Sequence, residues 1–149
     1  AASGVPAGTI AMSLTYDATK PDTLAALFKQ HSGRIAAVIT EPEELIPSPP
    51  EHIREIERLA KSNGALFILD EMVTGFRSGF PGAQSRLGLT PDLTAWGKAI
   101  GNGFSFCALT GRADVMDLGG LKLPHLDHPW RRGACAGGRS RGSRRVPAS

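Results

Sequence analysis

The sequence predicts an α/β fold in which helices flank a mostly parallel sheet. Two continuous apolar runs, residues 34–40 and 65–69, have the length and composition of buried strands. Between them, apolar side chains recur at helical spacing from Pro49 or Pro50 to a stop signal at Asn63-Gly64. A strand, a helix and a strand with short connections form a βαβ unit, whose strands lie parallel. We expect the first strand to be buried on both faces and the second to be buried as well.

The remaining elements follow from the spacing of apolar residues and from the positions of Gly and Pro. We expect a helix over 21–31, a proline-rich loop over 41–50, a long loop over 72–91 with a helical turn near 84–87, short strands over 93–96 and 106–109, and a final helix over 112–118. In open α/β sheets, ligands bind where loops leave the carboxyl ends of the strands.

Charge divides the chain into two parts. Residues 1–121 carry ten Lys or Arg and thirteen Asp or Glu, and they alternate apolar runs with polar turns as an ordinary α/β enzyme sequence does. Residues 122–149 carry seven Lys or Arg against one Asp and are rich in Arg, Gly and Ser. This basic tail is either disordered or read out of frame. If it is a genuine arm it could bind polyanions, although we expect no nucleic-acid partner.

Targeting and metal signals are missing from the sequence. No apolar run approaches the roughly 20 residues that a membrane-spanning helix needs, and the first residues do not resemble a signal peptide. Cys107 and Cys135 are too few for a disulfide framework or a metal site. We therefore expect a cytoplasmic protein without a metal.

Lys98 and Asp70 carry the strongest chemical signal. A lysine amine can form an imine with a carbonyl cofactor, and a carboxylate can pair with a protonated ring nitrogen; pyridoxal phosphate enzymes need both groups. Asp70 ends a predicted strand, and Lys98 stands in a turn rich in glycine, which allows close approach to a ligand. Taken singly, each residue could equally be a solvated charge in a turn.

Four segments together resemble the class III, fold-type I aminotransferases, and within them the glutamate-1-semialdehyde 2,1-aminomutase-like group. The resemblance covers roughly residues 20–120. The segments occur in the family's order and at its spacing: Phe67-Ile-Leu-Asp-Glu-Met-Val-Thr-Gly-Phe-Arg77, Gly82-Ala-Gln84, Leu89-Thr-Pro-Asp-Leu93 and Gly97-Lys-Ala-Ile-Gly-Asn-Gly103.

The resemblance implies a pyridoxal phosphate site built on three residues. Lys98 matches the lysine that binds the cofactor covalently and then moves a proton between substrate and cofactor. Asp70 matches the partner of the pyridine nitrogen, and Met72 matches the residue that packs on one ring face. The family also implies small amino donors and acceptors as substrates and a homodimer as the working form.

For the other motif residues, the resemblance leaves alternative roles open. Glu41 matches a family glutamate at a strand end, but the residues after it depart from the family's Gly-rich loop, which leaves its substrate role open. Glu71, Thr74 and Arg77 either support the Asp70 loop or act closer to the chemistry. The lysine and aspartate alone do not distinguish amino transfer or mutation from racemisation or decarboxylation on the same fold.

The resemblance implies that residues 1–121 are part of the large domain of such an enzyme, so we expect the chain to be a fragment. The family's phosphate-binding loop and small C-terminal domain have no counterpart here, so the isolated chain is expected to be inactive and not to bind cofactor tightly. Where the family has a Ser-Thr-Thr-His-Gly-like stretch, this chain reads Leu126-Asp-His-Pro-Trp130. A shifted frame of one possible coding sequence encodes that stretch, so we expect the frame to be lost between about Leu118 and Leu126.

Overall fold

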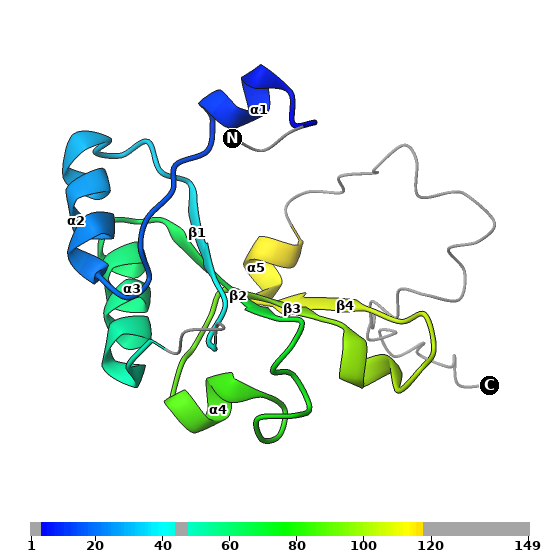
Figure 1. Ribbon diagram of the computed structural model, residues 1–149. Coiled ribbons are helices and arrows are strands. Elements are labelled where there is room, and N and C mark those ends of the chain that lie inside the picture. The colour runs from blue at the N-terminus through cyan, green and yellow to red at the C-terminus, as the bar shows by residue number, and fades with distance from the viewer. Residues whose placement is uncertain (1–3, 44–47, 118–149) are drawn as a thin grey trace, which may run out of the picture.

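A four-stranded sheet forms the centre of the computed structural model, which describes residues 4–43 and 48–117 (Figure 1). The strands are β1 (Ala37–Thr40), β2 (Leu66–Glu71), β3 (Leu93–Trp96) and β4 (Ala108–Gly111), in that spatial order. The pairs β1–β2 and β2–β3 are parallel, and β4 runs antiparallel to β3. The predicted α/β class with a mostly parallel sheet is therefore confirmed.

The four predicted helical segments are present in the predicted order, and two further short helices, over 7–11 and 98–101, were not predicted. The helices are α1 (Ala7–Ala11), α2 (Pro21–Gln30), α3 (Pro50–Ser62), α4 (Ala83–Leu87), the 3-10 helix η1 (Lys98–Gly101) and α5 (Ala113–Met116). Both α2 and α3 begin with proline, whose missing N–H would have no partner in a first turn. Gly64 follows α3 with a φ of 73°, the left-handed conformation that its sequence predicted. The segment β1–α3–β2 is the predicted βαβ unit.

Strand bounds differ from the prediction at three places. β1 begins at Ala37 and not at 34, β2 extends to Glu71, and β4 lies two residues later than the predicted strand over 106–109. Pairing decides the last position, because Leu93 of β3 lies beside Gly111 and the Arg112 N–H donates to the Asp92 carbonyl at 2.9 Å. The predicted end of the last helix, Leu118, lies outside the described residues.

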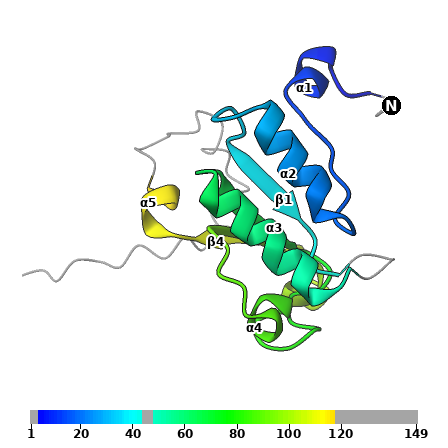
Figure 2. The same ribbon diagram turned by 90° about the vertical axis from the view of Figure 1, so that its left-hand side faces the viewer.

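Helices α2 and α3 cover one face of the sheet and lie side by side on it (Figures 1 and 2). Buried side chains alternate along β1, β2 and β3, as in Phe67 and Leu69 of β2, both 0% exposed. On the other face Ile39 of β1 is 58% exposed. The prediction that β1 is buried on both faces is therefore wrong within the described residues. The two long helices of this part of the chain, α2 and α3, both pack on one face of the sheet.

The core lies between this covered face and the two helices. Its largest fully buried side chains come from α2, α3 and β2: Leu24, Ile53, Ile56, Phe67 and Leu69. Burying an aliphatic or aromatic side chain of this size stabilises a fold by about 1.5–3 kcal/mol. The apolar face of α3 thus packs against one face of β2, and this packing holds in place the strand that carries Asp70.

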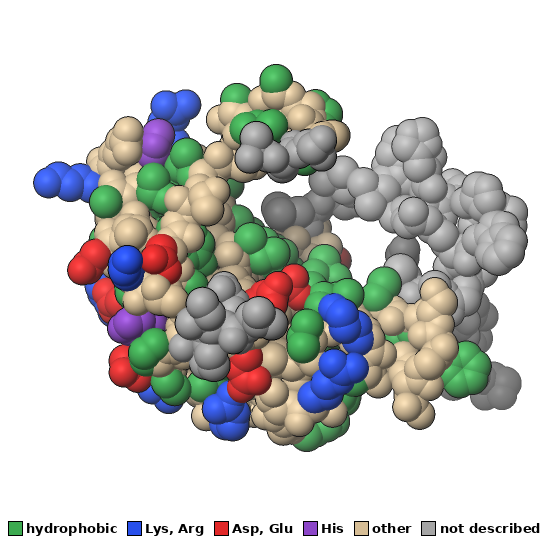
Figure 3. Space-filling model, in the orientation of Figure 1, with side chains coloured by type: hydrophobic (Ala, Val, Ile, Leu, Met, Phe, Trp, Pro, Cys, Tyr) green, Lys and Arg blue, Asp and Glu red, His purple; other side chains and the backbone are tan. Residues whose placement is uncertain are grey.

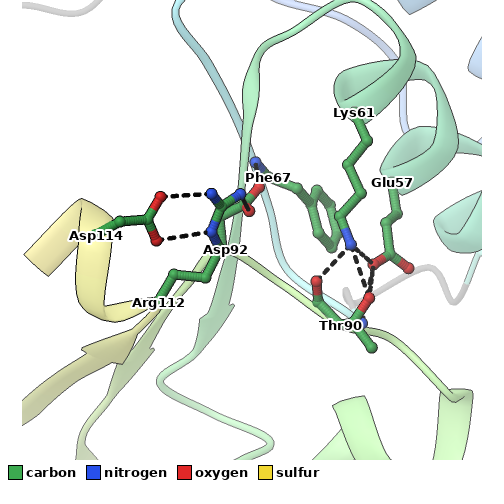
Figure 4. Close-up of polar contacts among 7 residues, drawn as sticks. All are labelled: Glu57, Lys61, Phe67, Thr90, Asp92, Arg112 and Asp114. Atoms are coloured by element: carbon green, nitrogen blue, oxygen red, sulfur yellow. Dashed lines mark hydrogen bonds and ion pairs between the residues drawn. The ribbon is translucent and has the colours of Figure 1, made fainter.

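A polar cluster lies at the edge of the sheet where the parallel strands β2 and β3 begin (Figure 4). Asp92 is only 4% exposed; its Oδ2 accepts the Phe67 N–H at 2.8 Å and its Oδ1 accepts Arg112 Nη1 at 2.8 Å. Arg112 also pairs with Asp114. Burial alone would raise the pKa of Asp92, but the Phe67 amide and the Arg112 guanidinium outweigh it and hold that pKa below its ordinary value.

A second buried carboxyl group lies in the same cluster. Glu57 of α3 accepts hydrogen bonds from Lys61 Nζ at 2.7 Å and from the Thr90 N–H and Oγ1, both at 2.9 Å. Lys61 Nζ in turn donates to the Thr90 carbonyl. These bonds tie the loop before β3 to the last turn of α3 and help set where β3 begins.

Replacing the Asp92 carboxyl group should destabilise the fold in a pH-dependent way. The substitution Asp92→Asn retains the side-chain shape but loses the ion pair, so unfolding at pH 7 should require about 1–3 kcal/mol less free energy. Because the folded-state pKa lies below the ordinary 3.8, the contribution is fully present above that value and is lost as the pH falls through the lowered pKa. Urea unfolding at a series of pH values measures the difference.

The control for this prediction is Asp114→Asn, which removes the other, exposed partner of Arg112. An exposed pair contributes little to stability, so this variant should unfold almost as the parent chain does. Equal losses in the two variants, or a loss in Asp92→Asn that does not shrink at low pH, would contradict the assignment.

Candidate active site

The carboxyl ends of β1, β2 and β3 meet at one edge of the sheet, as parallel strands require. Thr40 lies beside Leu69, so Glu41 follows β1 at the level of Asp70. Glu41 and Asp70 line one cavity of about 340 Å³ together with Tyr16. The structure thus brings together two of the acidic side chains that the sequence singled out.

Asp70 is a half-buried residue with one oriented carboxyl oxygen. Its Oδ1 accepts the Met72 N–H at 2.9 Å, which closes a short turn directly after the strand. Within residues 4–43 and 48–117, Oδ2 has no hydrogen-bond partner. One oxygen therefore fixes the side chain, and the other is available to a ligand in the cavity.

Lys98 begins η1 at the end of the next strand, three residues beyond Ala95, the β3 partner of Asp70. Its side chain is exposed and makes no ion pair or hydrogen bond with the part of the chain that the structure describes. Its φ is +51°, a left-handed conformation that is uncommon for any residue except glycine. Such strained residues are concentrated at functional sites.

Met72 connects the Asp70 turn to the Lys98 turn. A Cβ atom on Gly97 would lie 2.6 Å from Met72 Sδ, closer than real contacts allow. Gly97 is extended, with a φ of −165°, so its lack of a side chain matters for space and not for backbone freedom. The thioether thus packs directly on the backbone that precedes Lys98.

Glu71 points to the opposite face from Asp70 and is completely buried. Its carboxyl group accepts the N–H groups of Ala83 at 3.0 Å and Gln84 at 2.6 Å, and Thr74 Oγ1 donates to Oε2. Thr74 is also buried, at 3% exposed. The structure therefore joins Glu71 and Thr74 to each other and to α4, beneath the Asp70 turn.

Arg77 does not join this group. It is exposed, and its guanidinium approaches the Val73 carbonyl at 3.5 Å, a marginal hydrogen bond. Glu43, to which no sequence motif pointed, has partners instead: its Oε2 accepts a hydrogen bond from Ser78 Oγ at 2.9 Å, and its Oε1 pairs with Arg86. The only available signal was its place in the acidic, proline-rich segment after β1.

Tyr16 was also missed. Its hydroxyl group donates to the Ile39 carbonyl at 3.2 Å, and its ring lines the cavity that contains Glu41 and Asp70. No motif in the sequence pointed to this residue, because it precedes β1 in an irregular segment.

Charged side chains of both signs are interspersed over the face shown in Figure 3. Among the described residues there is no group of three His, Cys, Asp or Glu side chains that could hold a metal ion. The same part of the chain contains no helix that is long and apolar enough to cross a membrane. The expected basic tail over 122–149 and the expected loss of frame between 118 and 126 lie outside the described residues.

Comparisons with known proteins agree on the family of the matched segment. The chain is 43% identical over 119 residues to the glutamate-1-semialdehyde 2,1-aminomutase of Roseiflexus castenholzii, which covers 77% of this chain and 27% of the relative. An ω-transaminase from Sphaerobacter thermophilus superposes with a TM-score of 0.71 at 32% identity, over 80% of this chain and 28% of that one.

A further solved structure is that of the FumI protein of Sphingopyxis sp. MTA144 in its PLP internal aldimine form. It matches with a TM-score of 0.69 at 29% identity, over 77% of this chain and 29% of that one. The chain thus spans less than a third of the length of each of these proteins. Residues 9–122 match the family model described as aminotransferase class-III. The chain therefore belongs to the class III aminotransferase family.

Proposed function

We propose that this chain carries the pyridoxal phosphate-binding edge of an enzyme that transfers an amino group, as an aminotransferase or aminomutase. The observation that carries the proposal is the juxtaposition of Asp70 and Lys98. Both stand at the carboxyl ends of paired strands, and each offers a polar group that the described residues leave available. Family membership supports the same chemistry.

The residues at this edge suit the cofactor in the chemistry of their side chains. Oδ2 of Asp70 would accept the hydrogen bond of the pyridine nitrogen, Nζ of Lys98 would bind the aldehyde carbon, and the polarizable thioether of Met72 would pack on the ring. When bound, pyridoxal phosphate withdraws electrons from the carbon next to an amino group and so allows that carbon to lose a proton.

The chain's own residues then perform two tasks. The Met72 N–H holds Oδ1 of Asp70, so that Oδ2 would be left to bind a ligand in the cavity that Asp70 lines. Lys98 Nζ, held on a short turn at the exposed edge, would take a proton from the α-carbon of the substrate and return it at a neighbouring carbon. A neutral amine is required for that step.

Substrate, partner and location follow as parts of the same proposal. Glu41 shares the cavity with Asp70, which supports a contact with the small amino donor or acceptor. A second copy of the chain is the partner that family membership favours, and the cytoplasm is the proposed location.

Trapping of the cofactor on one lysine tests the proposal. With excess pyridoxal phosphate, borohydride reduction should place the pyridoxyl label mainly on the peptide that contains Lys98, because that amine is exposed and follows β3, the strand that pairs with β2 at Asp70. Peptide mass spectrometry identifies the labelled residue. The label should fall sharply in Asp70→Asn, whose amide is a weaker partner for a protonated ring nitrogen.

Two arginine variants control this measurement. Lys98→Arg keeps the charge but removes the reactive amine and should abolish the selective label, whereas Lys29→Arg in the last turn of α2 should leave it intact. A label spread evenly over Lys20, Lys29, Lys61 and Lys98 would contradict a site at this edge.

The contact between Met72 and Gly97 yields a separate prediction. A methyl group in Gly97→Ala needs the space of the thioether, which is the flexible end of Met72 and can shift, so the variant should be less stable by only about 1 kcal/mol in urea unfolding. The double substitution Gly97→Ala with Met72→Ala should lose less than the sum of the two single losses, because it removes the clash. The control Gly8→Ala places the same methyl group in open space and should not destabilise; additive losses would rule out the contact.

A further inference from the structure

We propose that Glu71 is a positioning residue whose buried carboxyl group holds the Asp70–Met72 turn in place. This inference rests on the proposed function, since it takes that turn to be the part that presents Asp70 to the cofactor. Asp70 and Glu71 are neighbours whose side chains leave opposite faces of β2. One would contact the ligand, and the other would fix the loop that contains the turn.

Glu71 anchors both ends of the loop that leaves β2. Near the start, Thr74 Oγ1 donates to Oε2, and the Gly75 N–H donates to the Glu71 carbonyl at 2.8 Å. At the far end, the carboxyl group accepts the first two N–H groups of α4, from Ala83 and Gln84. A helix of five residues is too short to be stable alone, so these bonds largely determine where α4 and the loop lie.

Two glycines show how closely the loop is packed on Glu71. A Cβ atom on Gly82 would lie 2.7 Å from the Glu71 carboxyl carbon, and one on Gly75 would lie 2.7 Å from the Glu71 carbonyl oxygen. Neither glycine has a positive φ, so space and not backbone freedom excludes a side chain there. The loop therefore lies against the Glu71 carboxyl group at Gly82 and against the Glu71 backbone at Gly75, and a side chain would not fit at either position.

The same network reaches the strand that leads to Lys98. Gln84, whose N–H binds Glu71, accepts a hydrogen bond from Thr94 Oγ1 of β3 at 3.0 Å. Trp96 of β3 lies beside Glu71 in the sheet register, and its ring is 5.6 Å from that of Phe76 in the loop. A shift of Glu71 would thus move the Asp70 turn and the approach to Lys98 relative to each other.

The backbone amide of Met72 reports on this positioning without any cofactor. Its N–H donates to Asp70 Oδ1, so loosening of the turn exposes it to solvent exchange. In Glu71→Gln, one carboxyl oxygen becomes an amide donor that faces other donors, and exchange at Met72 should accelerate by about tenfold. Amide hydrogen exchange followed by NMR measures this rate residue by residue in the 149-residue chain.

Glu57→Gln is the matched control. Glu57 is also a buried carboxyl group that accepts three hydrogen bonds, but it lies at the opposite edge of the sheet. Global destabilisation should be similar in the two variants, whereas local acceleration at Met72 should occur only in Glu71→Gln. Equal exchange at Met72 in both variants would mean that Glu71 merely stabilises the fold, and would overturn the inference.

A milder pair of variants decides the matter if Glu71→Gln does not fold. Thr74→Val removes the hydroxyl donor at nearly constant volume and should accelerate exchange at Met72, and Thr74→Ser restores the donor and should restore protection. No effect of Thr74→Val would overturn the inference. Because exchange needs no pyridoxal phosphate, absence of the Lys98 label with Met72 exchange still dependent on Glu71 would reject the proposed function alone.

Discussion

The site depends on one constraint, which is that the side chains of the last two residues of β2 point to opposite faces of the sheet. Asp70 points to the cavity and Glu71 points to the side covered by the helices, because successive side chains of a strand leave opposite faces. A shift of register by one residue would bury Asp70 and expose Glu71, together with the apolar side chains that now form the core. Burial of Phe67 and Leu69 under α3 therefore also fixes the orientation of Asp70.

Carboxyl groups secure both edges of the sheet, but they do so with different partners. At the amino-terminal edge, Asp92 binds the Phe67 amide and an arginine. At the carboxyl edge, Glu71 binds a hydroxyl group and two amides of α4, and no cation among the described residues contacts its carboxyl group. Under the proposed function this matters, because a cation beneath the Asp70 turn would compete with a protonated ligand for the Asp70 carboxyl group.

The elements with regular patterns could be predicted from the sequence, and the contacts between them could not. Helical spacing and proline gave the bounds of α3 almost to the residue, and the order of motifs gave the family. β4 was misplaced, because its position depends on pairing with β3 and not on its own apolar residues. Glu43 and Tyr16 were missed for the same reason: their partners, Ser78 and Ile39, lie 35 and 23 residues away.

The turn at Lys98 shows best why sequence alone falls short. Glycines at 97, 101 and 103 predicted a tight turn, yet the left-handed residues within it include Lys98 and Asn102. A lysine in this conformation costs about 1 kcal/mol or more, which glycine would avoid. Gly97, by contrast, has an extended backbone and lacks a side chain because Met72 fills the space. Stability alone would favour glycine at 98, so the position is better explained by a requirement for the lysine amine than by the needs of the turn.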